Sequence, residues 1–498
     1  MRELYHVIDG RCVGGASGRF LEGFEPMTGK VQSRIPLASK AEARAAVVSA
    51  VSAQPGWAAV NPQRRARVLV KFLELLARET ESLAELLSRE HGKTIADAKG
   101  DIQRGLEVIE FSTGVAHFMK GEYTDGAGAG IDVYSMRQPL GVMAGVTPFN
   151  FPAMIPMWMC GPSIACGNAF VLKPSERDPS VPLRLAELML EAGLPRGVFN
   201  VINGDKEAVD ALLDDPDVKA FSFVGSTAVA EHVYARGAAA GKRMQCLGGA
   251  KNHMVIMPDA DLDHAVDSLI GAAYGSAGER CMAISLAVPI GEATANELAR
   301  RLAARVKSLK IGASTDADAD FGPLVTKTHL DKVKAYVALG VDEGATLLVD
   351  GRDFKLPGFE DGFFMGGCLF DGVTRHMRVY REEIFGPVLC IARAGDFAEA
   401  LALVNEHEYG NGVAIFTRDG AAAREFVSKV QVGMVGVNVS IPTPLAYYGF
   451  GGWKRSFFGD LNQHGPDAMR FCTKTKTVTS RWSDGAQEGA SFVMPTMR

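Results

Sequence analysis

The sequence predicts an α/β protein with two parallel-sheet domains and a small β-strand extension. From Gly141 onward, short apolar runs alternate with helical patterns, as βαβ units around a parallel sheet require. A second series of the same kind begins near His253. The segment 122–137 looks like a hairpin that leaves the body, and the β-prone run 473–480 is a second exposed strand with no obvious core partner. Pairing with each other or with a second subunit would cover these strands, so we expect an oligomer.

The N-terminal third of the chain predicts helices rather than strands. Ser39–Glu42 has the pattern of a capping box, and the apolar-periodic run 43–51 follows it. Asn61-Pro62 begins a second helix with leucines at helical spacing, and a third is expected from about Ile95 to Phe118. Three amphipathic helices in series are typical of a cover over a sheet.

Nine apolar runs are the predicted strands of the two domains. The first domain takes the runs 142–146, 169–172, 198–201 and 220–224, with helices expected over 181–192 and 228–239; the second takes 254–257, 283–289, 389–392, 412–416 and 434–438.

Composition excludes several classes of protein. A chain of 498 residues is too long for one core, and a net charge of −5 predicts no nucleic-acid partner. The eight cysteines form no C-x-x-C pair and no Cys/His cluster, which argues against a metal site and a disulfide framework. We therefore expect a reducing, cytoplasmic setting, and the chain start lacks the apolar run of a signal peptide.

One uncharged stretch superficially resembles a membrane span. No charged residue lies between Arg137 and Lys173. Four prolines interrupt this stretch and would break a spanning helix, so we expect buried strand, loop, packed helix and strand, with no membrane association.

Cys281 is the strongest candidate for a chemical role. It lies in the stretch 275–283, after several small residues and immediately after Arg280. A neighbouring cation favours the thiolate, which is the reactive form of cysteine. The alternative is that Cys281 fills the core, as most free cysteines do.

Five motifs in order give the chain a resemblance to a known family. They are Thr147–Pro152, Lys173–Glu176, Phe223–Ser226, Cys281 and Glu382–Pro387. With these motifs the chain resembles the aldehyde dehydrogenase superfamily over residues 20–482. The stretches 249–253, 275–283, 436–442 and 456–459 look like its CoA-acylating methylmalonate-semialdehyde dehydrogenase branch.

The resemblance implies a fold with two Rossmann-type α/β domains and a small β oligomerisation flap. Residues 1–120 and 141–249 would bind NAD, and 250–455 would form the catalytic domain with the nucleophilic cysteine. Segments 121–140 and 470–498 would supply the oligomerisation strands. The expected assembly is a homotetramer, built as a dimer of dimers.

The resemblance also implies roles for individual residues. Cys281 would attack an aldehyde, and Asn150 would hold the oxyanion, although Asn150 between prolines is equally a turn residue. Arg104 and Arg280 would hold a substrate carboxylate, against the alternatives of a solvated helix face for Arg104 and thiol activation for Arg280. The residues implied for NAD are Thr147, Phe149, Lys173, Glu176, Arg177, Ser226, Gly248, Glu383 and Phe385, of which Lys173 and Glu176 could alternatively be an exposed ion pair.

One departure from the family pattern bears on the product. Hydrolytic members carry a glutamate that activates water, whereas Leu247 stands at that position here and its neighbour Cys246 has no carboxylate. Without a base, water attacks the thioester slowly, so coenzyme A takes the acyl group. The implied reaction converts methylmalonate or malonate semialdehyde to propionyl-CoA or acetyl-CoA, with the carboxylate lost as bicarbonate. A hydrolytic NAD-dependent aldehyde dehydrogenase and a non-enzymatic scaffold remain the alternatives.

Overall fold

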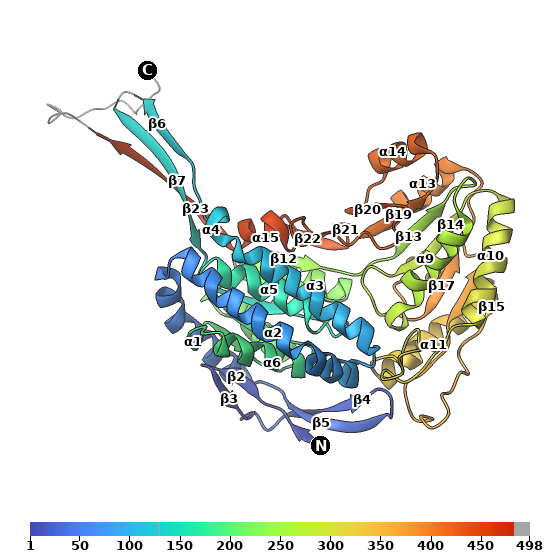
Figure 1. Cartoon of the computed structure of the whole chain (residues 1–498), viewed down its shortest axis with the longest axis horizontal. Coiled ribbons are helices and arrows are strands. Elements are labelled where there is room, and N and C mark those ends of the chain that lie inside the picture. The colour runs from blue at the N-terminus through green and yellow to red at the C-terminus, as the bar shows by residue number, and fades with distance from the viewer. Residues whose placement is uncertain (129, 483–498) are drawn as a thin grey trace.

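Two separate β-sheets organise the chain, and each forms the centre of one domain (Figure 1). The computed structural model describes residues 1–128 and 130–482. The first sheet has eight strands in the order β22-β12-β11-β8-β9-β10-β2-β3, and the second has seven in the order β15-β16-β17-β14-β13-β19-β20. The predicted α/β class with two sheet domains is confirmed.

The strand order of the first sheet reverses at β8. Five strands run parallel: β8 (Val142–Val146), β9 (Ala169–Lys173), β10 (Phe199–Val201), β11 (Val218–Val224) and β12 (Arg243–Leu247). The chain builds β9 and β10 on one side of β8 and then crosses to place β11 and β12 on the other. Ligands of open α/β sheets bind beside such a reversal, at the carboxyl ends of the strands.

Helices cover both faces of the first sheet. One face packs against α2 (Pro62–His91), α3 (Ile95–Thr113), α5 (Met154–Ala165) and α6 (Ser180–Glu191). The other packs against α1 (Lys40–Ala59), α7 (Lys206–Asp214) and α8 (Thr227–Ala239). The predicted third helix ends at Thr113, and a short helix, α4 (Val115–Phe118), follows Gly114.

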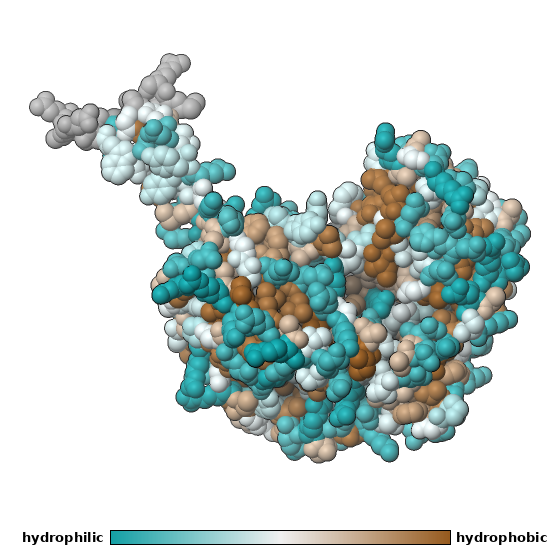
Figure 2. All heavy atoms as spheres, in the orientation of Figure 1, coloured by the Kyte–Doolittle hydropathy of each residue, from teal (hydrophilic) through white to brown (hydrophobic). Residues whose placement is uncertain are grey.

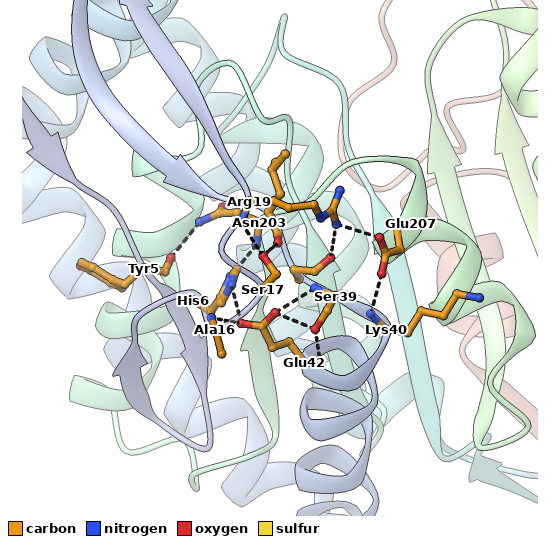
Figure 3. Close-up of polar contacts among 12 residues, drawn as sticks. Tyr5, His6, Ala16, Ser17, Arg19, Ser39, Lys40, Glu42, Asn203 and Glu207 are labelled. Carbon is orange, nitrogen blue, oxygen red and sulfur yellow. Dashed lines mark hydrogen bonds and ion pairs between the residues drawn. The ribbon is translucent and has the colours of Figure 1, made fainter.

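The N-terminal segment is fastened to the edge of this sheet by polar contacts (Figure 3). β2 (His6–Ile8) pairs with β10, and β3 (Arg11–Val13) pairs with β2. The Ser39 capping box forms as predicted, and Glu42 also accepts a hydrogen bond from the backbone N–H of Ala16 at 2.6 Å. One side chain therefore caps α1 and holds the preceding loop.

The second sheet contains the five strands that the sequence predicted there. They are β13 (Asn252–Ile256), β14 (Ile284–Pro289), β17 (Val388–Ile391), β19 (Gly412–Phe416) and β20 (Met434–Val437). Two further strands, β15 (Thr346–Val349) and β16 (Cys368–Asp371), extend the sheet at the other edge. The helices α9 (Leu262–Tyr274), α10 (Glu292–Lys307), α11 (Lys327–Asp342), α13 (Phe397–Glu406) and α14 (Gly420–Lys429) surround it, and α12 (Arg378–Arg381) is a single turn.

The chain returns to the first domain after the second sheet. β22 (Phe457–Gly459) pairs antiparallel with β12, and α15 (Gly465–Phe471) follows. Two smaller sheets complete the body, one of β1 (Arg2–Glu3), β5 (Lys30–Pro36) and β4 (Phe20–Glu25), the other of β18 (Tyr409–Gly410) and β21 (Trp453–Lys454).

A three-stranded arm projects from the body (Figure 1). It consists of β6 (Tyr123–Gly128), β7 (Ile131–Pro139) and β23 (Thr473–Arg481), and β7 is the central strand. Thr473 lies opposite Pro139 and Arg481 opposite Ile131. The two β-prone segments therefore pair with each other, which is one of the two pairings that the sequence predicted. Residues 483–498 of the predicted flap lie outside the described residues.

The uncharged stretch folds as predicted into strand, loop, packed helix and strand. Every residue of α5 is buried, and β8 and β9 on either side of it are buried throughout. Among the residues described, no helix combines the length and the apolarity that crossing a membrane would require.

Candidate active site

A cavity of about 320 Å³ lies at the carboxyl ends of β8, β11 and β12, where the first domain faces the second. It contains the sulfur-bearing residue Cys281 together with Asn150. The cavity brings together eight residues that the sequence singled out: Phe149, Asn150, Arg177, Ser226, Gly248, Cys281, Glu383 and Phe385.

A buried lysine holds the loop that contains Asn150. Lys93, which follows the end of α2, donates a hydrogen bond from Nζ to the backbone carbonyl of Asn150 at 2.6 Å. Its ammonium group is fully buried, 3.6 Å from the carboxylate of Asp101 and 4.3 Å from the ring centre of Phe151. This contact fixes the backbone of the predicted oxyanion residue.

The turn before Cys281 has an unusual backbone. Ser276, Ala277 and Gly278 have φ values of 54°, 52° and 74°. The left-handed region is costly for residues with a Cβ, and such strain concentrates at functional sites. A Cβ on Gly278 would lie 2.2 Å from the carbonyl oxygen of Gly386, so only glycine allows the two loops to approach this closely.

Two asparagines hold the Cys281 carbonyl. The side-chain amides of Asn252 and Asn411 both donate to it, at 2.9 and 3.0 Å. Asn252 in turn accepts the backbone N–H of Gly412 at 3.0 Å. The paired strands β13 and β19 therefore fix the backbone of Cys281 from the side of the second sheet.

The environment of the thiol disfavours the thiolate. Burial raises the pKa of the Cys281 thiol to about 12, and the negative charge of Glu383 adds to this, against smaller opposing effects of backbone N–H groups and Arg280. Arg280 lowers the thiol pKa only as the smallest of these effects, and its guanidinium is paired with Asp97 at 2.5 Å. Its activation of the thiol stays a prediction. Glu383 is itself buried, which raises its pKa, and accepts the N–H of Ala250 at 2.9 Å.

Another part of the cavity wall has groups that can bind an anion. Ser226 is the N-cap of α8 but makes no side-chain capping bond, and Gly225 beside it also lines the cavity. The free N–H groups of a helix start attract phosphate. Arg177 stacks on the ring of Phe149, with its guanidinium carbon 4.8 Å from the ring centre.

Three residues predicted for the cofactor lie outside this cavity lining. Thr147 is buried, and its hydroxyl has no hydrogen-bond partner. Lys173 and Glu176 form an ion pair at 2.7 Å, and Glu176 lines a neighbouring cavity of about 350 Å³ that also contains Arg177. Their assignment to the adenosine ribose stays a prediction.

Both arginines predicted for a substrate carboxylate involve helix α3: Arg104 lies on this helix, and Arg280 forms an ion pair with one of its aspartates. Asp97, Asp101 and Arg104 fall at i, i+4 and i+7 and therefore share one helix face. Asp97 pairs with Arg280, and Arg104 donates to the carbonyl of Pro444 at 2.6 Å and to Glu107 at 2.9 Å. Neither arginine lines the 320 Å³ cavity, and Arg280 lines a smaller one, of about 20 Å³, with Cys281.

Sequence reasoning missed part of the cavity wall. His329 and Lys332 on α11 line the cavity, and so does Thr328. The only local signal was Thr326, a helix N-cap, which marks where a helix begins but not what it faces. In the described part of the chain, no group of three or more His, Cys, Asp or Glu side chains could hold a metal ion.

Removing the charge of Glu383 should lower the pKa of Cys281. We expect Glu383→Gln to speed alkylation of Cys281 by iodoacetamide at pH 8.5, by up to about tenfold if the pKa falls by one unit. Glu382→Gln is the matched control, because Glu382 pairs with Arg378 outside the cavity. An alkylation rate that is unchanged or lower in Glu383→Gln would contradict the assigned cause of the high pKa.

Comparison with known proteins places the chain in a family. The model of the aldehyde dehydrogenase family matches residues 13–478. A malonate-semialdehyde dehydrogenase of Pseudomonas aeruginosa is 54% identical over all 498 residues, covering 100% of both chains. An acylating methylmalonate-semialdehyde dehydrogenase of Arabidopsis thaliana mitochondria is 46% identical over 99% of this chain and 80% of its own length.

Solved structures agree with the fold. A protein from Sinorhizobium meliloti 1021, assigned as a methylmalonate-semialdehyde dehydrogenase and complexed with NAD, superposes with a TM-score of 0.97 at 64% identity, over 97% of this chain and 99% of that one. A methylmalonate-semialdehyde dehydrogenase from Oceanimonas doudoroffii gives 0.96 at 52% identity, over 97% and 99%. The chain belongs to the aldehyde dehydrogenase family.

Proposed function

We propose that this protein is an NAD-dependent, CoA-acylating dehydrogenase that oxidises methylmalonate or malonate semialdehyde to propionyl-CoA or acetyl-CoA. The main support is that Cys281 and Asn150, which belong to different domains, line the same cavity. The N-terminus of helix α8, which can bind a phosphate, lines this cavity as well. The names and NAD complex of the relatives support the same reaction.

The chain's own groups account for the covalent step. The Cys281 thiol loses its proton to solvent, its sulfur attacks the aldehyde carbon, and the π electron pair of the carbonyl moves to the oxygen, which becomes an oxyanion. The Asn150 amide and the Cys281 backbone N–H are the proposed donors to that oxygen; each such donor typically contributes about 10²–10³ in rate. NAD, when bound, accepts the hydride. The acyl group then stays on Cys281 as a thioester. Its carboxylate leaves as bicarbonate, with a water molecule supplying the hydroxyl of bicarbonate and the proton that replaces it on carbon. Coenzyme A then takes the acyl group and the Cys281 thiol is released.

The residues present fit a dinucleotide. The N-terminus of α8 at Ser226 can bind the pyrophosphate through its backbone N–H groups. The Ser226 hydroxyl makes no capping hydrogen bond and can also donate to the pyrophosphate. Gly248 also lines the cavity, and its missing side chain lets the Arg455 carbonyl pack against it, since a Cβ there would lie 2.8 Å from that oxygen. Phe149 and Phe385 supply an apolar wall, with their ring centres 5.8 Å apart.

The hydrolytic alternative has one observation in its favour. Glu383 places a carboxylate in the same cavity as Cys281, although position 247 carries none. Its Oε1 already accepts the N–H of Ala250, and its Oε2 lies so close to Gly249 that a Cβ there would be 2.6 Å away. These contacts leave Glu383 less suited to activating water than a free carboxylate, so we favour transfer to coenzyme A.

We further propose a homo-oligomer, a tetramer built as a dimer of dimers. The arm (β6, β7 and β23) leaves the body, and β20 is an edge strand of the second sheet. Figure 2 shows apolar surface over the β20 region, on the side facing the arm. Val437 and Val439 there are 41% and 53% exposed, and a second copy would cover such an edge.

The eight free cysteines favour a reducing compartment, which we propose is the cytoplasm.

Product analysis with and without coenzyme A tests the proposed function. With NAD and malonate semialdehyde, we expect coenzyme A to raise steady-state turnover about 100-fold or more, because a missing general base costs 10²–10⁴ in rate. The product should be acetyl-CoA, followed by mass spectrometry. Free acid formed at a comparable rate without coenzyme A would select the hydrolytic alternative.

An arginine variant tests whether Arg104 binds the substrate carboxylate. We expect Arg104→Leu to raise KM for malonate semialdehyde about 10-fold or more, because a charge-assisted hydrogen bond contributes about 1.5–3 kcal/mol, while KM for propanal stays unchanged. Lys99→Leu on the same helix, which removes only a surface pair with Glu81, is the control. Equal effects on both aldehydes would remove Arg104 from substrate recognition.

A further inference from the structure

Phe385 has a backbone conformation that needs support. Its φ is 61°, a region that bulky side chains rarely adopt. The residue lines the Cys281 cavity, and its ring meets that of Phe149 edge-on, at 86°. Strain of this kind persists only where surrounding contacts hold it.

His329 supplies the contact. Its Nε2 lies 2.6 Å from the backbone carbonyl of Phe385. Because a carbonyl only accepts, Nε2 carries the proton. Burial lowers the pKa of His329 to about 4, so the ring is neutral and the proton stays on that nitrogen. The ring of His329 lies edge-on to both Phe149 and Phe385, with centres 6.1 and 6.2 Å apart.

The start of α11 determines where His329 lies. Thr326 is the N-cap, and its hydroxyl accepts the backbone N–H of His329 at 3.2 Å. The preceding residue, Val325, donates its N–H to Oε1 of Glu279 at 3.2 Å. The first turn of the helix is therefore fixed by a residue of the nucleophile loop.

Among the described residues, the Glu279 side chain makes one hydrogen bond, the one from Val325. It lies two residues before Cys281 and is 0% exposed. Oε1 is 3.6 Å from Nε2 of His329, whereas Oε2 makes no hydrogen bond and faces Nε2 of His91 at 3.9 Å. Hydrogen bonds and close contacts thus run from Glu279 through Val325, Thr326 and His329 to Phe385.

We propose that His329 is a positioning residue: its hydrogen bond holds Phe385 against Phe149 in the wall of the Cys281 cavity, where Phe385 would contact NAD, and Glu279 ties that contact to the Cys281 loop. This inference rests on the proposed use of NAD. It assigns no proton transfer to His329 or Glu279; both act on the reaction through the placement of Phe385.

Substitutions of His329 test the inference through NAD binding, measured by fluorescence titration without aldehyde or coenzyme A. We expect His329→Leu to raise Kd for NAD about 10-fold, because the partly buried carbonyl of Phe385 loses the hydrogen bond from His329. His329→Gln, whose amide N–H can reach the same carbonyl, should stay within about threefold of wild type. His376→Leu, at an exposed histidine, is the matched control. Wild-type affinity in His329→Leu, or equal losses in His329→Leu and His329→Gln, would overturn the proposal.

A double-mutant cycle separates support of Phe385 from direct contact with NAD. If His329 acts through Phe385, the double variant His329→Leu, Phe385→Ala should bind NAD no more weakly than Phe385→Ala alone. Additive losses would overturn the proposal. Acyl-CoA formation by the wild type reports on the proposed function separately, because it does not depend on any comparison among these variants.

Discussion

The backbone around Cys281 is confined from two directions, and the geometry of the site follows from that confinement. On one side Gly278 approaches the carbonyl of Gly386 so closely that no side chain fits between them. On the other, Asn252 and Asn411 hold the Cys281 carbonyl. The left-handed turn at 276–278 is the conformation that satisfies both contacts. The sulfur is therefore placed by the second domain before any ligand arrives.

This placement has an electrostatic consequence. The same burial that fixes the thiol raises its pKa, and Arg280, the nearest cation in sequence, is occupied by Asp97. The thiol of Cys281 is consequently protonated near neutral pH. A positive charge brought into the cavity would favour the thiolate, so the resting chemistry of Cys281 depends on what shares the cavity with it.

Local patterns predicted the fold well because they act over a few residues. The apolar runs of β8 and β19 and the capping box at Ser39 are visible in the sequence and form as expected. The pairing of Cys281 with Asn150 was available only through the family resemblance, because 131 residues separate them in a 498-residue chain. Lys93 and His329 gave no signal, since nothing local distinguishes a buried lysine or histidine from an exposed one. The ion pair of Arg280 with Asp97 gave no local signal either, because Asp97 is distant in sequence.

In the proposed reaction, Cys281 carries an acyl group that water removes slowly and coenzyme A removes quickly. The most direct test of this reaction is peptide mass spectrometry of the enzyme after incubation with NAD and malonate semialdehyde in the absence of coenzyme A. The account predicts an acyl adduct on the peptide containing Cys281, which persists until coenzyme A is added and then disappears. Unmodified Cys281 accompanied by continuous NADH formation would contradict it.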